Sequence, residues 1–135
     1  MLVDVPAVAS TPEGCAALRD AFQGAPLLGF GCAQDLARLR ATPAADAWAS
    51  SDGVRDLQAA LSRPRGGPGL AAAAKAYLGK PLDKAQQCSD WDARPLSDAQ
   101  RAYAALDAVA VALIFERLRA VDEAIDVVAR APPAR

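Results

Sequence analysis

Tyrosine and aspartate stand four residues apart in the C-terminal third of the chain, at Tyr103 and Asp107. On a helix this spacing places both side chains on one face, one turn apart. A phenol and a carboxylate in that arrangement could together hold a metal ion and a water molecule. The residues around Asp107 are apolar, and a buried carboxylate is costly unless it is paired or bound to a cation. A tyrosine packed into the core beside a carboxylate at the helix rim is the alternative interpretation.

A second candidate carboxylate is Asp35, which follows the apolar segment 27–31 directly. That segment is typical of a short buried strand followed by glycine. In open α/β sheets ligands gather at the carboxyl ends of the strands, which would place Asp35 at such a crevice. A carboxylate in the first turn of a helix also interacts favourably with the helix dipole, so a purely structural role for Asp35 stays open.

The composition restricts the classes of function. The 135 residues carry 15 Lys and Arg against 16 Asp and Glu, so nucleic-acid binding would need a local basic patch. The chain contains no histidine, which excludes histidine-based triads and histidine metal sites. Three widely spaced cysteines argue against a disulfide framework and fit a reducing compartment, the nucleus or the cytoplasm. No apolar run approaches the length of a membrane span, so no membrane association is expected.

The order of predicted elements favours an α/β domain with a mostly parallel sheet. Ser10 with Glu13, and Ser97 with Gln100, have the spacing of helix capping boxes. Apolar runs predict strands at 2–5, 26–31 and 54–57. Helices are predicted after residue 10 to about 22, at 34–40, at 70–78, and from 98 to about 120 or further.

Three segments of the chain resemble the 3′-5′ exonuclease domain of the DEDD superfamily, in its tyrosine branch, similar to RNase D and the Werner-syndrome-type exonucleases. Residues 28–36 look like the second motif of that family, in which glycines lead to a metal-binding aspartate. Residues 78–84, 88–91 and 94–108 look like the third motif and its approach. Residues 56–58 resemble the strand between the two motifs. The similarity covers roughly residues 1–120.

The resemblance implies an RNase H-like, three-layer α/β fold and hydrolysis of nucleic-acid phosphodiester bonds from the 3′ end of DNA or RNA. In the family, four carboxylates hold two divalent ions, Mg²⁺ or Mn²⁺, which orient water and stabilise charge at phosphorus. Carried over to this sequence, Asp35 helps to hold one metal ion and Asp107 binds the other. Tyr103 orients the attacking water or helps to deprotonate it.

Basic residues near the third motif are the expected contacts with the nucleic acid. Lys80, Lys84 and Arg94 could follow the phosphates, although a solvated face is equally compatible with their positions. Arg65, in a glycine-rich loop, is a further candidate for contact with the phosphate backbone. Trp91 could stack on a base, but a tryptophan in a proline-rich connection is more often a packing anchor.

The first motif of the family, Asp-x-Glu on the first strand, is absent from this sequence, because Asp4 is followed by Val5 and Pro6. The resemblance therefore implies that residues 1–122 form a partial exonuclease domain without the first strands of the sheet. Residues 123–135 would be the helix end and a frayed tail. Two of the four carboxylates would be missing, so impaired activity and weak metal binding are expected.

This departure leads to several expectations about what the chain is. It would be a truncated product of a longer exonuclease gene, or a naturally shortened pseudo-enzyme. The alternatives to an exonuclease are a catalytically inactive nucleic-acid-binding module and a protein-interaction remnant. The remnant would associate through the apolar edge that the strand at 27–30 exposes when its neighbours are missing.

Overall fold

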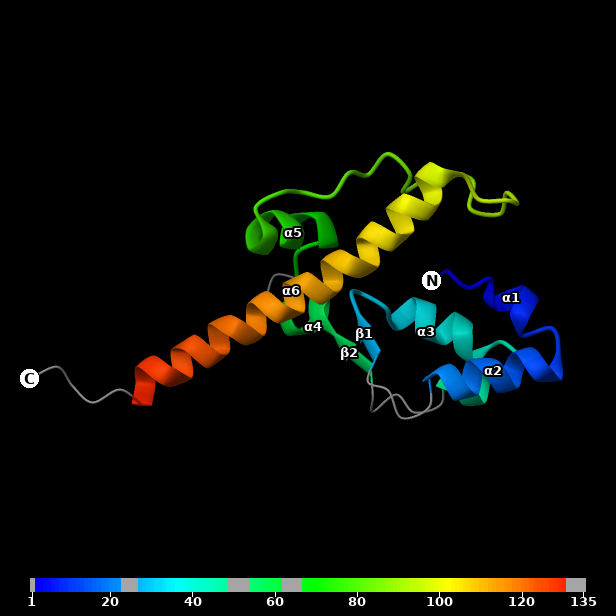
Figure 1. The fold of residues 1–135 in the computed structure, drawn as a ribbon, viewed down its shortest axis with the longest axis horizontal. Helices are drawn as coiled ribbons and strands as arrows, with labels where there is room; N and C mark the ends of the chain where they lie inside the picture. Colours follow the sequence, from blue (N-terminus) through cyan, green and yellow to red (C-terminus); the bar gives the residue numbers. More distant parts are fainter. Residues whose placement is uncertain (1, 23–26, 49–53, 62–66, 131–135) are drawn as a thin grey trace, which may run out of the picture.

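The computed structural model describes residues 2–22, 27–48, 54–61 and 67–130, with side chains as far as residue 122. Figure 1 shows a long C-terminal helix that crosses the molecule beside two short strands, with smaller helices around them. The elements in chain order are α1 (Val5–Val8), α2 (Pro12–Phe22), β1 (Leu27–Gly29), α3 (Ala33–Arg40), the 3-10 helix η1 (Ala45–Trp48), β2 (Val54–Asp56), α4 (Leu57–Leu61), α5 (Leu70–Leu78) and α6 (Asp98–Arg130).

The two strands pair in parallel, with Leu27 opposite Val54 and Gly29 opposite Asp56. Two adjacent parallel strands require a crossover connection, and the connection between β1 and β2 contains α3 and η1. Because the strands are in register, both end at the same edge of the sheet. This parallel pair among helices confirms the predicted α/β class, and it places the turn after Gly29 beside the end of β2.

The core is divided into two clusters that lie on opposite faces of β1. Successive side chains of a strand point to opposite faces of the sheet, so Leu27 and Leu28 pack on different sides of β1. Leu28 packs against a cluster that contains Leu57 and Ile114. Leu27 packs against the other cluster, which contains Leu18 and Trp48. Helices therefore cover both faces of β1, which agrees with the predicted layered arrangement.

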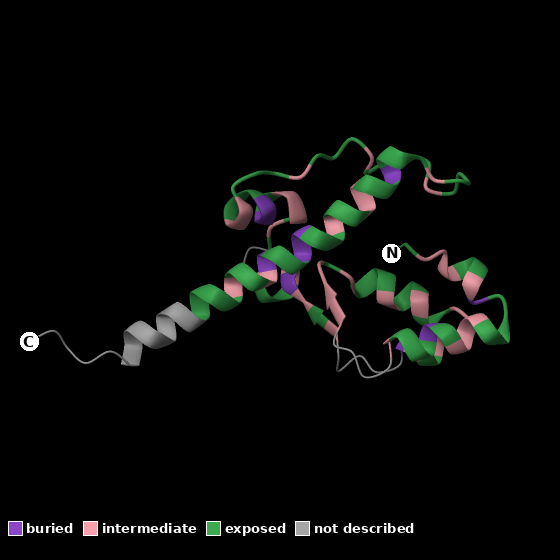
Figure 2. Ribbon diagram, in the orientation of Figure 1, coloured by how far each residue is buried: buried purple, intermediate pink, exposed green. Residues whose placement is uncertain are grey.

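The longest helix is anchored where it meets α5, as the buried residues in Figure 2 show. Ala73 and Ala74 of α5 are buried, and their small side chains allow the two helices to approach closely. Ile114 of α6 is fully buried in the same cluster. Gly79 ends α5 with a φ of 81°, a left-handed conformation that favours glycine, so the predicted helix end is confirmed.

The strand predicted at residues 2–5 is wrong, because a helical turn begins there. Asp4 caps α1 by accepting a hydrogen bond from the backbone N–H of Ala7 at 3.2 Å. Pro6 has no N–H to donate to a sheet and is well suited to the first turn of a helix. The apolar residues Val3, Val5 and Val8 instead pack against the cluster on the Leu27 face of the sheet.

One of the two predicted capping boxes is confirmed, and the other, between Ser10 and Glu13, is wrong, because Thr11 caps the helix in place of Ser10. At the start of α6, Ser97 Oγ accepts from the N–H of Gln100 at 3.1 Å, and Gln100 Oε1 accepts from the N–H of Ser97 at 2.9 Å. At the start of α2, Thr11 Oγ1 accepts from the N–H of Gly14 at 3.1 Å. Ser10 instead donates its hydroxyl to the carbonyl of Ala7 at 2.6 Å.

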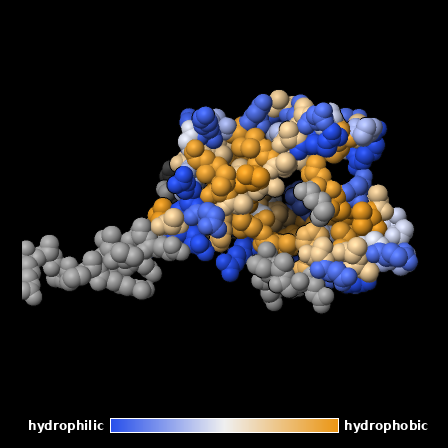
Figure 3. Space-filling view, in the orientation of Figure 1, coloured by the Kyte–Doolittle hydropathy of each residue, from blue (hydrophilic) through white to orange (hydrophobic). Residues whose placement is uncertain are grey.

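Apolar side chains remain accessible on α6, and Figure 3 shows apolar surface over the region of α5 and α6. Leu106, Val109 and Leu113 are each about half exposed. In the described part of the chain the sheet has two strands, so β1 and β2 each have an unpaired edge. Self-association through such an edge stays a prediction. None of the helices in that part is both long and apolar enough to cross a membrane.

Candidate active site

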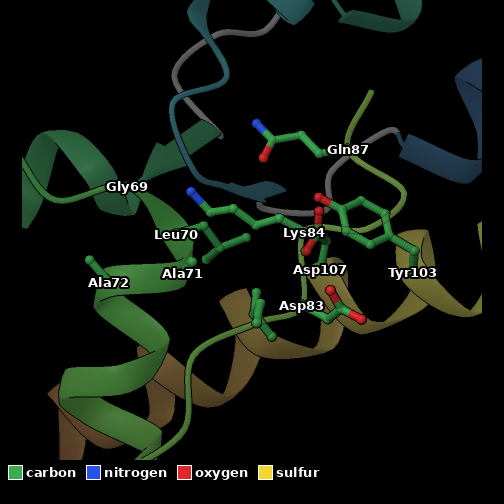
Figure 4. Close-up of a pocket in the computed structure, with 10 residues that line it drawn as sticks. Gly69, Leu70, Ala71, Ala72, Asp83, Lys84, Gln87, Tyr103 and Asp107 are labelled. Carbon is green, nitrogen blue, oxygen red and sulfur yellow. The ribbon is translucent and has the colours of Figure 1, made fainter. Parts of the chain in front are cut away.

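A pocket of about 270 Å³ lies between the start of α5, the connection that follows α5, and α6. Tyr103 and Asp107 enter it from α6, and Lys84 enters it from the connection. Figure 4 shows these side chains together with the other residues of the pocket wall. The structure thus brings together three of the residues that the sequence singled out. The other lining residues are Gly69, Leu70, Ala71, Ala72, Leu82, Asp83 and Gln87.

Tyr103 and Asp107 interact directly in the pocket. Their side chains are hydrogen-bonded, and the tyrosine hydroxyl points toward the carboxylate (Figure 4). Burial raises the pKa of Asp107, and the hydrogen bond from Tyr103 offsets only part of that rise. Burial, followed by the negative charge of Asp107, raises the pKa of Tyr103. The pair is therefore a protonated phenol that donates to a partly desolvated carboxylate.

Trp91 holds the ring of Tyr103 in place. The two ring centroids lie 6.0 Å apart with an angle of 49° between the planes, which is within the range of a favourable aromatic pair. The indole Nε1 of Trp91 donates to the carbonyl of Gln86 at 3.1 Å. Trp91 thus occupies the packing role that its proline-rich surroundings favoured, and it ties the connecting segment to the start of α6.

Gln100 fixes the connecting segment to α6 from the inside. Only 6% of its surface is exposed. Its Nε2 donates to Ser89 Oγ at 3.1 Å and to the carbonyl of Asp90 at 2.7 Å. The sequence indicated the capping role of Gln100 but not these contacts. A glutamine, which has a donor as well as an acceptor, at the third position of a capping box was the available signal.

Asp35 is not among the residues that line the pocket. It occupies the first turn of α3, just beyond the carboxyl end of β1, as predicted, and its side chain is exposed. Among the described residues, no group of three or more His, Cys, Asp or Glu side chains is arranged to hold a metal ion. The part of Asp35 in a shared metal site with Asp107 therefore stays a prediction.

The four predicted nucleic-acid contacts have different surroundings. Lys84 lines the pocket, while Lys80 is exposed and outside the pocket wall. Arg94 is engaged within the protein, because its Nη2 lies 2.7 Å from Asp4 Oδ2 and its Nη1 donates to the carbonyl of Trp91 at 2.9 Å. Arg65 lies outside the described residues. Among the three of these cations that the structure describes, Lys84 is therefore the best placed to meet a phosphate in the pocket.

Comparisons with known proteins identify the family of this chain. A model of the 3′-5′ exonuclease family matches residues 8–121, and the chain belongs to this family. Exonuclease mut-7 of Caenorhabditis elegans is 50% identical over 46 residues, which are 34% of this chain and 5% of that protein. Ribonuclease D of Acidiphilium cryptum is 56% identical over 39 residues, which are 29% of this chain and 10% of that protein.

A solved structure supports the same assignment at the level of the fold. The crystal structure of the Aedes aegypti Nibbler EXO domain superposes with a TM-score of 0.63 at 28% sequence identity. The match covers 79% of this chain and 58% of that chain. The fold is therefore that of the RNase H-like exonuclease domains, as predicted, and the chain spans only a small part of the curated relatives that it matches. The family implies a nucleic-acid substrate and a general use of divalent metal ions.

Proposed function

We propose that this chain removes nucleotides from the 3′ end of a DNA or RNA strand, with Tyr103, Asp107 and Asp35 as its catalytic residues and Mg²⁺ or Mn²⁺ as its cofactor. One observation carries the proposal. Asp107 is a partly buried carboxylate whose pKa is raised, and its partner in the pocket is a neutral phenol. A cation beside Asp107 would supply the positive charge that a desolvated carboxylate lacks.

The chemistry of the pocket fits a hard divalent cation. The polar groups that line it include the hydroxyl of Tyr103 and the amide of Gln87, and oxygen is the ligand that Mg²⁺ and Mn²⁺ prefer. Mg²⁺ commonly takes one or two carboxylates and completes its shell with water and substrate phosphate. Asp107 would bind one such ion in the pocket, and Asp35 would help to hold the other.

The cation, when bound, would stabilise charge on the reacting phosphate and lower the pKa of water. Tyr103 would orient the attacking water through its hydroxyl oxygen, which can accept a hydrogen bond while its O–H donates to Asp107, and its raised pKa keeps the phenol protonated at neutral pH. That protonation favours orientation over deprotonation as the role of Tyr103. Lys84 would attract a phosphate of the strand into the pocket.

The two alternatives from the sequence lack comparable support. A binding module without catalysis would not need a desolvated carboxylate in its pocket, and an interaction remnant would not need a pocket at all. The family match favours the exonuclease over both.

Degradation of a single strand labelled at its 3′ end, in the presence of Mn²⁺, tests the proposal with separate DNA and RNA substrates. Asp107→Asn keeps the shape of the side chain and removes its charge, and we expect its rate to fall at least about 100-fold, the scale of lost catalytic groups. Asp98→Asn is the matched control on the same helix, because Asp98 is exposed and outside the pocket. Equal rates for wild type and Asp107→Asn would contradict the proposal, and binding without degradation would favour the module.

A further inference from the structure

Asp56, the last residue of β2, accepts hydrogen bonds from four backbone N–H groups on two different segments. Two donors belong to the turn after β1, with Gly31 N 2.9 Å from Oδ1 and Cys32 N 3.0 Å from Oδ2. The other two belong to the start of α4, with Gln58 N at 2.9 Å and Ala59 N at 3.4 Å, both from Oδ1. Burial acts to raise the pKa of Asp56, but these N–H groups hold it below its ordinary value. The carboxylate is therefore charged at neutral pH.

The turn that Asp56 holds is the one that begins α3 and so carries Asp35. The carbonyl of Cys32 accepts the N–H of Leu36 at 2.9 Å, which closes the first turn of that helix around Asp35. Gly31 has a φ of +66°, a conformation that favours glycine. Two features therefore fix the position of this turn: its hydrogen bonds to Asp56 and the left-handed backbone conformation of Gly31.

Gln58 extends this support to the pocket of Asp107. Its Oε1 lies so close to Gly31 that a Cβ built there would be 2.6 Å away. Its Nε2 donates to the carbonyl of Pro68 at 3.2 Å. The next residue, Gly69, caps α5 through its carbonyl, which accepts from the N–H groups of Ala72 and Ala73 at 3.0 Å each. Gly69 and Ala72 themselves line the pocket.

We propose that Asp56 and Gln58 are positioning residues that hold the helix of Asp35 and the α5 wall of the Asp107 pocket in one fixed arrangement. Neither side chain lines the pocket. The expected effect on metal binding rests on the proposed function. The link between the two segments does not depend on it. Residues that orient metal ligands from behind commonly change metal affinity 10- to 100-fold when mutated.

The test compares Asp56→Asn, Gln58→Ala and Leu18→Val in the full chain. Leu18→Val removes one methylene from the other core cluster and controls for a general loss of stability. In Asp56→Asn, hydrogen exchange should accelerate about tenfold over that control at Gly31 and Cys32 and also at Ala72 and Ala73. Mn²⁺ affinity, followed from the signal of free Mn²⁺, should fall about tenfold. Gln58→Ala should accelerate exchange at Ala72 and Ala73 while the bonds from Cys32 to Asp56 remain.

Three results would count against the proposal, and each is distinct. If the hydrogen-exchange rates of Asp56→Asn match those of Leu18→Val at every residue, Asp56 contributes only to overall stability. Acceleration confined to Gly31 and Cys32 would remove the link through Gln58 to α5. Unchanged Mn²⁺ affinity despite faster exchange would remove the positioning role. A wild-type chain that binds no Mn²⁺ would overturn the proposed function, while the exchange pattern would still decide whether the two segments are linked.

Discussion

The substitution Gln100→Ala tests how the connecting segment is held against α6. It deletes an amide that is 6% exposed and that makes three side-chain hydrogen bonds. Its Oε1 accepts from the N–H of Ser97 at 2.9 Å, and its Nε2 donates to Ser89 Oγ at 3.1 Å and to the carbonyl of Asp90 at 2.7 Å. Alanine at this position preserves the helical backbone of α6 but removes the hydrogen bonds that the Gln100 side chain makes to its three partners.

The expected loss follows from the number of bonds. A typical intramolecular hydrogen bond contributes about 1 kcal/mol net, so three of them give about 3 kcal/mol. For a domain of this size, 1 kcal/mol corresponds to roughly 3–4 °C in Tm, which predicts a fall of about 10 °C. Access of water to the emptied space would reduce this loss, and a buried, unpaired carbonyl at Asp90 would increase it.

Thermal unfolding followed by circular dichroism measures this effect. Gln87→Ala is the matched control, because Gln87 belongs to the same connection but its side chain is exposed. We expect the control to change the free energy of unfolding by less than about 0.5 kcal/mol. A Tm for Gln100→Ala within about 3 °C of the wild type, a smaller shift than the loss of one hydrogen bond would cause, would mean that these bonds do not hold the connecting segment.

Three further predictions concern the helix α6. Asp107→Asn should raise Tm at pH 7, because the pKa of Asp107 is higher in the folded than in the unfolded state and the wild type therefore loses stability as pH rises through the folded pKa. The difference in Tm between variant and wild type should shrink below pH 4, and no difference at either pH would contradict the prediction. Tyr103→Phe should raise the pKa of Asp107 further, since it deletes the hydrogen bond that lowers it; a carboxyl ¹³C titration with no upward shift would contradict it. Ile114→Ala should lower the free energy of unfolding by about 2–5 kcal/mol in urea denaturation, since Ile114 is fully buried, and a loss under about 1 kcal/mol would contradict it.

Sequence patterns predicted the features that depend on local spacing. The pairing of Tyr103 with Asp107 follows from a separation of four residues on a helix. The start of α6 follows from the reciprocal hydrogen bonds of Ser97 and Gln100. The place of Asp35 at the end of β1 follows from an apolar run that leads to glycine.

Features that depend on contacts between distant segments were missed or misplaced. The N-terminal apolar run is typical of a strand, although Asp4 caps a helical turn and pairs with Arg94, far along the chain. The start of α5 became a pocket wall only through its packing against α6. The role of Asp56 depends on a parallel pairing that brings two strand ends together. Spacing along the chain does not encode these relations, because tertiary packing decides them.

The proposed function requires a divalent cation in the pocket at Asp107, and the place where Mn²⁺ binds shows whether the pocket holds one. Paramagnetic broadening of backbone amide signals locates the ion residue by residue. We predict that signals of Tyr103, Asp107 and Lys84 broaden at the lowest Mn²⁺ concentrations, more strongly with a short single strand present, and that Asp107→Asn abolishes the effect. Broadening that instead begins around an exposed carboxylate such as Asp20, and that persists in Asp107→Asn, would contradict the claim.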